Sequence, residues 1–401
     1  MTQTLLKELE KGSKNAILKK KIIAHYIYNG SSTITELSKE LNLSIPTVTK
    51  FIGEMSEDGF INEYGKLETS GGRHPILYGL NPESGYFIGV DMNRFSLDIG
   101  MINFKGDLIF HKVDIPYNLE NTPQALDELC RIVREEIDGL NINHDKILNI
   151  CVDISGRVNP ESGYSFSIFN FSEQPLSGTL TEKIGYPVCI DNDTRALTYG
   201  EFMNGCVDGE KDIIFINVNW GLGIGIVIDG KIYTGKSGFA GEFGHIPAFD
   251  NEILCHCGKK GCLETEASGR ALHRVLLERI AGGETSILSD RINAGEDITL
   301  DHIIDAINKE DPLCIEILEE IGQKLGKYTA SLINIFNPEL VIIGGKLSFA
   351  EDYLTEPIKS AIRKYSLNLV NKDSVIMSSK LKEKAGIVGA CMLARSRMFE
   401  C

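Results

Sequence analysis

Residues 241–264 read GEFGHIPAFDNEILCHCGKKGCLE and carry the strongest local signal in the chain. They bring one histidine and three cysteines close together in the sequence: His245, Cys255, Cys257 and Cys262. One imidazole and three thiolates form a closed tetrahedral zinc site, and glycines at positions 258 and 261 supply the tight turns that such a loop needs. The pattern therefore predicts a structural Zn²⁺ ion bound by these four side chains.

Two alternatives to this ligand set remain open from the residues alone. His256 is a rival for the fourth position, although its place between two ligating cysteines would require it to fold back awkwardly. The other alternative is that the three cysteines are reduced thiols in a surface loop, where they would oxidise readily. Ligand number and spacing favour zinc, with His245 as the fourth ligand.

The sequence on both sides of this loop predicts two α/β units. For the first unit we expect a helix at residues 123–139 and strands at residues 86–92, 96–103, 107–115, 147–154 and 187–193. For the second unit we expect strands within residues 212–233, a long helix through residues 318–332 and a strand at residues 339–345. Strands that end in polar or glycine residues predict an α/β, bilobal fold with a central cleft.

The first eighty residues have a different pattern, with three helices followed by a hairpin. Thr33 and Glu36 form a capping box at the start of the second helix, and Ser44 with Pro46 begins the third. The third helix has a predicted buried stripe of Val48, Ile52 and Met55. This order predicts an N-terminal all-α winged helix-turn-helix.

Composition and charge limit the possible functions. The 401 residues, 42% apolar and 24% charged, are typical of a globular protein with two to four domains. No stretch resembles a membrane span or a signal peptide, so we expect a cytoplasmic protein without membrane insertion. Residues 1–80 hold ten basic and nine acidic residues (+1), and the rest hold 31 and 47 (−16), which sum to −15. We therefore expect DNA contact only in the N-terminal fifth.

The motif at residues 241–264 closely resembles the signature of the ROK family (repressors, open reading frames and sugar kinases). The resemblance extends from about residue 12 to the end and includes NPELVIIGG at residues 337–345 and AGIVGA at residues 385–390. With its helix-turn-helix, the chain is similar to the NagC, Mlc and XylR type of repressor. The resemblance implies an actin-like domain, in which two ribonuclease-H-like lobes surround a sugar cleft.

On this basis we expect three domains. Residues 1–82 form the winged helix-turn-helix, residues 83–190 plus 385–401 the first lobe, and residues 191–384 the second lobe with the zinc site.

The resemblance also implies which residues contact a sugar. Asn192 and Asp193 match the family's Asn-Asp pair, whose aspartate is the general base in the kinases. His245 would use one ring nitrogen for the metal and the other for a sugar hydroxyl. The remaining family contacts fall on Asn170, Glu242 and Glu264. From the residues alone, Asp193 also fits a helix cap and Glu242 a solvated loop position.

Phosphate binding, in contrast, is predicted to be lost. Asp91–Phe95 reads DMNRF where the family's first phosphate loop reads Asp-x-Gly-Gly-Thr, so both glycines are missing. Gly221–Gly223 reads GLG in place of Gly-Thr-Gly, whereas Gly344-Gly345 is intact and Arg94 offers a side chain to phosphate. Because backbone N–H groups must approach a phosphate closely, we expect no kinase activity and no catalytic residue. The alternative is a sugar kinase with a DNA-binding head, in which Asp193 is the base.

The predicted DNA contacts lie on the third helix and the wing. On the helix, we expect Ser44, Thr47 and Lys50 to face outward, with Thr49 and Phe51 at the margins. On the wing, Arg73 lies in a Gly-Gly-Arg-x-Pro segment that suits a narrow minor groove. Lys19, Lys20 and Lys21 add positive charge on the first helix. A winged domain that binds protein instead of DNA is the alternative.

Together these patterns predict a sugar-responsive transcriptional repressor that binds operator DNA as a homodimer or homotetramer. A sugar or sugar phosphate in the cleft would change the angle between the lobes and hence the spacing of the DNA-binding heads. One branch of the family is instead silenced by a membrane transport protein, and this partner remains open. A constitutive DNA-binding protein with a relic sugar pocket is a further alternative.

Overall fold

The N-terminal head is a winged helix-turn-helix whose helices begin at the predicted caps. The computed structural model describes residues 12–66 and 75–399. Thr33 accepts a hydrogen bond from the N–H of Glu36, and Glu36 Oε2 accepts one from the N–H of Thr33 at 2.8 Å, which completes the capping box. The elements of the head are α2 (Lys14–Asn29), β1 (Ser32–Thr33), α3 (Ile34–Glu40), α4 (Ile45–Glu57), β2 (Ile61–Lys66) and β3 (Ile76–Leu80).

The head contains a small sheet in addition to its helices. The two residues of β1 pair with β3, which also pairs with β2, so a three-stranded sheet stands where the sequence predicted a hairpin. On α4, Val48, Ile52 and Met55 are buried as predicted. Phe51 is also buried, with 3% of its surface exposed, although it was expected at the margin of the outer face.

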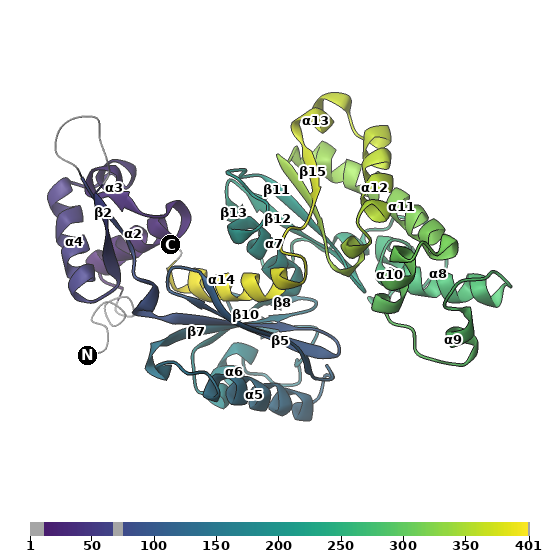
Figure 1. Ribbon diagram of the computed structural model, residues 1–401, viewed down its shortest axis with the longest axis horizontal. Helices are drawn as coiled ribbons and strands as arrows, with labels where there is room; N and C mark the ends of the chain where they lie inside the picture. Colours follow the sequence, from purple (N-terminus) through teal and green to yellow (C-terminus); the bar gives the residue numbers. More distant parts are fainter. Residues whose placement is uncertain (1–11, 67–74, 400–401) are drawn as a thin grey trace. The chain divides into compact units, whose positions relative to one another are not determined.

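The first five-stranded sheet has the strand order β10-β7-β4-β5-β6. Strand β5 pairs antiparallel with β4 and with β6, whereas β7 pairs in parallel with β4 and β10 pairs in parallel with β7. Helices α5 and α6 cover one face and α14 the other (Figure 1). A Cβ at Gly89 would lie 2.5 Å from the backbone nitrogen of Cys391, so this glycine permits α14 to pack on β4. The elements are β4 (Tyr86–Met92), β5 (Ser96–Asn103), β6 (Leu108–Pro116), α5 (Pro123–Asp138), β7 (Ile147–Ile154), β8 (Val158–Asn159), β9 (Tyr164–Ser165), α6 (Leu176–Ile184), β10 (Val188–Asn192) and α14 (Ala385–Phe399).

An aromatic cluster joins the head to this sheet. The ring of Phe60, which follows α4, lies 5.4 Å from that of Phe104 after β5. The Phe104 ring lies 6.0 Å from Phe87 on β4 and 5.5 Å from Phe399 at the end of α14. Each of the four side chains is at most 1% exposed. The core of the head is therefore continuous with the core between β4 and α14.

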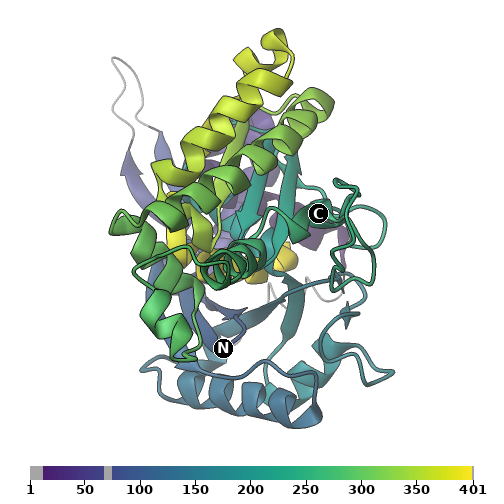
Figure 2. The ribbon, with the colours of Figure 1, turned by 90° about the vertical axis from the view of Figure 1, so that its right-hand side faces the viewer.

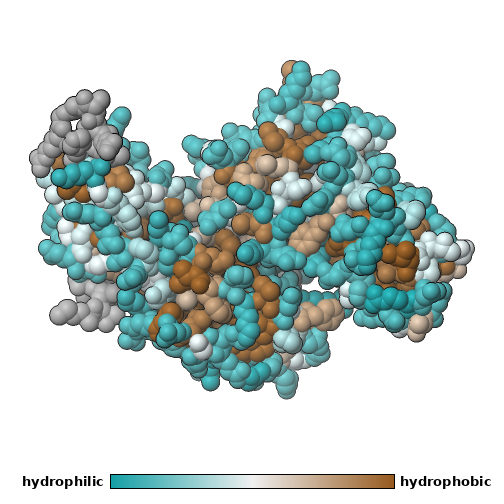
Figure 3. Space-filling model, viewed as in Figure 1, coloured by the Kyte–Doolittle hydropathy of each residue, from teal (hydrophilic) through white to brown (hydrophobic). Residues whose placement is uncertain are grey.

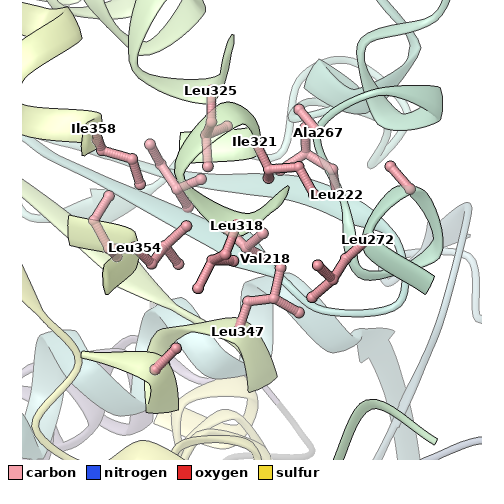
Figure 4. Packing of buried hydrophobic residues seen from close by; sticks show 14 of the residues in the cluster. Val218, Leu222, Ala267, Leu272, Leu318, Ile321, Leu325, Leu347, Leu354 and Ile358 are labelled. Carbon is pink, nitrogen blue, oxygen red and sulfur yellow. The ribbon is translucent and has the colours of Figure 1, made fainter. Parts of the chain in front are cut away.

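The second five-stranded sheet repeats this order, as β13-β12-β11-β14-β15. Helices α11 and α12 lie side by side over it (Figure 2), and their core includes Leu318, Leu325 and Ile358 (Figure 4). A Cβ at Gly326 would lie 2.4 Å from the carbonyl oxygen of Ile358, so glycine permits this close helix contact. The elements are α7 (Asp193–Asn204), β11 (Ile213–Val218), β12 (Leu222–Ile228), β13 (Lys231–Ile232), α8 (Gly269–Ala281), α9 (Ser289–Asn293), α10 (Leu300–Asn308), α11 (Pro312–Phe336), β14 (Leu340–Gly344), α12 (Asp352–Tyr365), α13 (Asn368–Asp373) and β15 (Val375–Ser378).

Residue contacts divide the chain into two units, Met1–Asp193 with Ile387–Cys401 and Thr194–Gly386. Each unit holds one sheet of ribonuclease-H-like strand order. The predicted fold class, a winged helix-turn-helix followed by an α/β domain of two such sheets, is confirmed. In the part of the chain that the structure describes, no helix is long and apolar enough to cross a membrane.

Candidate metal centre and ligand-binding residues

The cysteine loop folds back on itself through two glycines. Gly258 and Gly261 have φ angles of +85° and +71°, in the left-handed region that favours glycine. The N–H of Gly258 donates to the carbonyl of Cys255, and a Cβ at Gly261 would lie 2.1 Å from the carbonyl oxygen of Phe249. This turn returns the chain so that Cys262 can approach Cys257.

The four predicted ligands lie together at this turn: His245, Cys255, Cys257 and Cys262. Their donor atoms all lie within 4.8 Å of one another. The Cys255 Sγ–His245 Nδ1 and Cys257 Sγ–Cys262 Sγ distances are both 3.6 Å. Tetrahedral zinc bonds place ligand atoms about 3.5–3.8 Å apart. The donor set and its spacing therefore fit a metal ion of the zinc type.

His256 takes part in a different contact. Its Nδ1 lies 2.9 Å from Glu264 Oε1, and Cys255 is the third member of this smaller group. Glu264 is 6% exposed, and its Oε2 also accepts a hydrogen bond from the N–H of Leu222 at 3.0 Å. Burial raises the pKa of Glu264, but these two donors outweigh it and hold the pKa below its usual value.

The second ring nitrogen of His245 faces away from the cysteines. His245 Nε2 lies 3.6 Å from Glu242 Oε2, and the Glu242 side chain is 42% exposed. Nδ1 of the imidazole is thus directed to the predicted metal ligands, and Nε2 is directed to a solvent-accessible carboxylate. This is the arrangement that the dual role of His245 requires.

Asn192 and Asp193 lie where β10 ends and α7 begins. Asp193 Oδ2 accepts a hydrogen bond from Ser155 Oγ at 2.6 Å, and its Oδ1 accepts one from Asn192 Nδ2 at 2.8 Å. Sequence reasoning missed Ser155. It follows β7, the parallel neighbour of β10, so the shared carboxyl edge of the two strands was the available signal.

Asn170 lines a cavity of about 230 Å³ together with Phe166 and Gln174. Both groups of its amide are already hydrogen-bonded: Oδ1 accepts from Asn121 Nδ2, in the segment before α5, at 2.9 Å, and Nδ2 donates to the Phe166 carbonyl at 3.2 Å. Asn121, which sequence reasoning also missed, therefore holds this loop. Asn170, Asn192 and Asp193 belong to the first unit, whereas Glu242, His245 and Glu264 belong to the second.

The loop that corresponds to the first phosphate element carries large side chains in place of the family's glycines. Phe95 is 63% exposed and the Arg94 guanidinium lies 5.0 Å from the centre of its ring. Asn93 Nδ2 donates to Asp98 Oδ2 at 3.2 Å. In the second element, Gly221 packs against Glu264 and Gly223 against Thr194, where a Cβ would come within 2.9 Å of each neighbour. These two glycines thus have packing roles of their own.

Four aspartates lie in register across the first sheet. Asp98 on β5, Asp91 on β4, Asp153 on β7 and Asp191 on β10 are successive cross-strand neighbours. Arg397 of α14 forms an ion pair with Asp191 at 2.7 Å. Asp153 is fully buried, and its burial together with the neighbouring Asp91 raises its pKa well above the usual value. Burial, with Asp98 and Asp193 nearby, raises the pKa of Asp91 to about 7. This part of the sheet disfavours any further negative charge.

On the recognition helix α4, Ser44, Thr49 and Lys50 are exposed and Thr47 is half-buried. Ser44 Oγ and Thr47 Oγ1 lie 2.7 Å apart, and Thr49 Oγ1 donates to the Ile45 carbonyl. Arg73 lies outside the described residues.

The expected patch of three lysines on the first helix needs one correction. Lys19 is 3% exposed and its Nζ lies 2.7 Å from Glu54 Oε2, so this lysine stabilises the packing of α2 on α4. It is not available to bind DNA.

A winged helix-turn-helix followed by two sheets of ribonuclease-H-like strand order defines a class: DNA-binding regulators built on a sugar-kinase-like body. Residues 16–62 match the winged helix-turn-helix DNA-binding family, and residues 88–397 match the ROK family. The chain belongs to the ROK family.

Both regulators and kinases are similar to the chain. A xylose repressor of Caldicellulosiruptor bescii is 33% identical over 402 residues, covering 99% of this chain and 98% of that protein. A solved ROK family transcriptional regulator, a homologue of the Escherichia coli Mlc protein, has a TM-score of 0.80 at 27% identity and covers 96% of this chain and 97% of that one. A ROK family glucokinase from Streptomyces griseus, solved with glucose and AMPPNP, has a TM-score of 0.66 at 28% identity and covers 78% of this chain and 100% of that one. The two regulators thus match nearly the whole chain, and the kinase does not.

Proposed function

We propose that this protein is a transcriptional repressor of carbohydrate-metabolism genes whose ROK domain binds a sugar effector. The observation that carries the proposal is the likeness to a xylose repressor over 99% of the chain, head and body together. A kinase needs no recognition helix, whereas a sugar-responsive repressor needs both parts. We expect the protein to act in the cytoplasm.

The head would bind operator DNA through α4 and the wing. Thr47 and Ser44 contact bases or phosphates, Lys50 contacts a phosphate with Thr49 at the margin, and Arg73 enters the minor groove. One such module contacts few phosphates, so we propose a homodimer or homotetramer on two half-sites. A membrane transport protein that silences the repressor is the alternative partner.

The body would bind the sugar through the carboxylate, amide and imidazole groups that the family resemblance assigns: Asn170, Asn192, Asp193, Glu242, His245 and Glu264. Zinc bound by His245, Cys255, Cys257 and Cys262 would supply no chemistry beyond fixing the loop. It would orient His245 so that Nε2, beside Glu242, meets a sugar hydroxyl. The metal is therefore structural in this proposal, and its loss removes the sugar response.

We propose that phosphoryl transfer is absent. The side chains of Asn93 and Arg94 occupy the place of the two glycines, and the row of aspartates that includes the buried Asp153 and Asp191 begins on the adjoining strand. Both features oppose the approach of a polyphosphate. The domain division proposed is 1–82 for the head, 83–190 plus 385–401 for the first lobe and 191–384 for the second.

The likeness to glucokinases favours a second candidate, a sugar kinase with a DNA-binding head. Two measurements separate the candidates. A thermal-shift panel of sugars identifies the effector, because a ligand at a hundredfold excess over its Kd stabilises by about 2.7 kcal/mol. A coupled assay of ATP consumption is then run with that sugar. Stabilisation without turnover supports the proposal, whereas turnover that disappears in Asp193→Asn supports the kinase.

A further inference from the structure

The cavity beside Asn170 has a wall that the proposed sugar contacts do not use. Its wall comes from residues between positions 164 and 176, among them Tyr164, Phe166, Asn170 and Gln174, and we call it the aromatic pocket. Figure 3 shows apolar residues among hydrophilic ones in the part of the first unit where Figure 1 labels β8 and β10. Sites for complete small molecules have volumes of about 300–1,000 Å³. The aromatic pocket, with about 230 Å³, therefore has room for one ring of a larger ligand.

The wall of the aromatic pocket combines aromatic rings with uncharged polar groups. Phe166 is 48% exposed, and its ring centre lies 6.4 Å from that of Tyr164. Asn170 and Gln174 are exposed and bring amide groups, and none of the residues of this wall is charged. A neutral sugar ring has an apolar C–H face that packs on an aromatic ring and hydroxyl groups that bond to amides. A phosphorylated ligand, in contrast, needs a cationic partner.

The loop around Asn170 is held in a defined conformation. Phe169 is 3% exposed and has a φ angle of +55°, which is unusual for a bulky residue. Asn121 Oδ1 accepts a hydrogen bond from the N–H of Phe169 at 2.6 Å, and Asn121 Nδ2 donates to Asn170 Oδ1 at 2.9 Å. The hydroxyl of Tyr164 donates to the Glu173 carbonyl at 3.0 Å. Such a backbone angle persists only where its surroundings enforce it, so the pocket is formed before a ligand binds.

The aromatic pocket is connected to the proposed sugar contacts of the same unit. Asn192 Nδ2 donates to the Gly156 carbonyl at 2.9 Å, and the carbonyl of the next residue, Arg157, accepts from the N–H of Phe166 at 2.8 Å. Asn170 belongs both to the wall of the pocket and to the proposed sugar contacts. Its two hydrogen bonds within the protein leave one N–H and one oxygen lone pair for a ligand.

We propose that the aromatic pocket binds a second saccharide unit, so that the effector is a neutral disaccharide or oligosaccharide. One unit lies against the contacts of the proposed sugar site, and the next packs on the ring of Phe166. Asn170 contacts the ligand where the two units join, and Gln174 bonds to hydroxyl groups of the second unit. The inference rests on the proposed function, because it extends the same sugar site.

The test compares each monosaccharide with a matched disaccharide. The probes are xylose with xylobiose, glucose with cellobiose, and N-acetylglucosamine with its β-1,4-linked disaccharide. Thermal shift identifies the pair that stabilises the full-length protein, and calorimetric titration gives the two Kd values. We expect the disaccharide of that pair to bind roughly tenfold more tightly than its monosaccharide.

Phe166→Ala removes the exposed ring of the pocket. We expect this variant to raise the Kd of the disaccharide by about fivefold to tenfold and to leave that of the monosaccharide within about twofold. Phe336→Ala is the matched control, because Phe336 is 38% exposed and belongs to the second unit, and it should change neither Kd. Gln174→Ala, which removes an exposed amide, is expected to act on the disaccharide alone and replaces Phe166→Ala if that variant loses the circular dichroism spectrum of the wild type.

Three results would overturn the inference while the proposed function stands. These are a wild type that binds the monosaccharide as tightly as the disaccharide, a Phe166→Ala variant with both affinities unchanged, and a folded Phe166→Ala variant that loses both affinities equally. A panel in which no sugar stabilises the protein would contradict the proposed function and the inference together.

Discussion

At the scale of single residues, His245 has two different neighbours: Nδ1 faces Cys255 and Nε2 faces Glu242. The spacing of the loop predicts the cysteine cluster, because glycines and ligands lie close in sequence. It does not predict that His256 pairs with Glu264, since that contact depends on how the returning loop is placed. Ser155 and Asn121 were missed for the same reason, as each bonds a residue about forty positions or more away.

The role of the metal ligands leads to the first prediction. Cys257→Ser removes one of four ligands, so we expect loss of bound zinc and of sugar-dependent stabilisation together. Metal content is measured by mass spectrometry and the sugar response by thermal shift. Cys206→Ser, a half-buried thiol outside the loop, is the control and should keep both. A metal-free Cys257→Ser protein with a full sugar response would refute the coupling through His245.

The aspartate row predicts a dependence of stability on pH. Asp91 has a folded pKa of about 7 against 3.8 as its ordinary value, so the folded state binds more protons between these values. Stability therefore falls as the pH rises from about 4 to 7. Asp91→Asn removes one ionisation from the row that includes Asp98 and Asp153. We expect this variant to exceed the wild type by about 1–3 kcal/mol at pH 8 and by much less at pH 5.

Urea unfolding at the two pH values measures this difference. Asp145→Asn, at an exposed position, should leave the difference between pH 5 and pH 8 unchanged. An Asp91→Asn variant that is less stable than the wild type by the same amount at pH 5 and pH 8 would contradict the raised pKa of Asp91.

At the scale of elements, local chemistry predicted most of the head. Caps at Thr33 and Ser44 place the starts of α3 and α4, because the side chains satisfy N–H groups within three residues. β1 was not predictable, since two residues carry no periodicity and their pairing with β3 lies more than forty positions away. The burial of Lys19 was equally hidden, because it depends on Glu54 of another helix.

Exposed positions on α4 give the element-scale prediction. Lys50 is 63% exposed and its Nζ lies 3.8 Å from Glu54, a weak contact that a phosphate can replace. We expect Lys50→Ala to weaken operator binding, to lower the slope of log affinity against log salt by about 1, and to leave the sugar Kd unchanged. Gel shifts at several salt concentrations measure this. Lys309→Ala, in an exposed ion pair of the second unit, is the control. Equal loss of DNA and sugar binding in Lys50→Ala would indicate misfolding instead.

At the scale of the whole molecule, strand patterns predicted both sheets. The runs at residues 86–92, 147–154 and 339–345 became β4, β7 and β14, because apolar runs bounded by polar or glycine residues fit strands buried on both faces. The row of four aspartates could not be foreseen, since it depends on register between strands. The aromatic link from Phe60 to Phe399 joins positions over 300 residues apart, which no local pattern encodes.

In the proposed function, sugar binding changes operator binding without phosphoryl transfer. The most direct test is an operator gel shift titrated with the sugar identified by thermal shift, with and without ATP and magnesium. We predict that operator affinity changes with sugar in a saturable way and that ATP makes no difference. Operator binding that ignores every stabilising sugar, or that responds only when ATP is consumed, would contradict it.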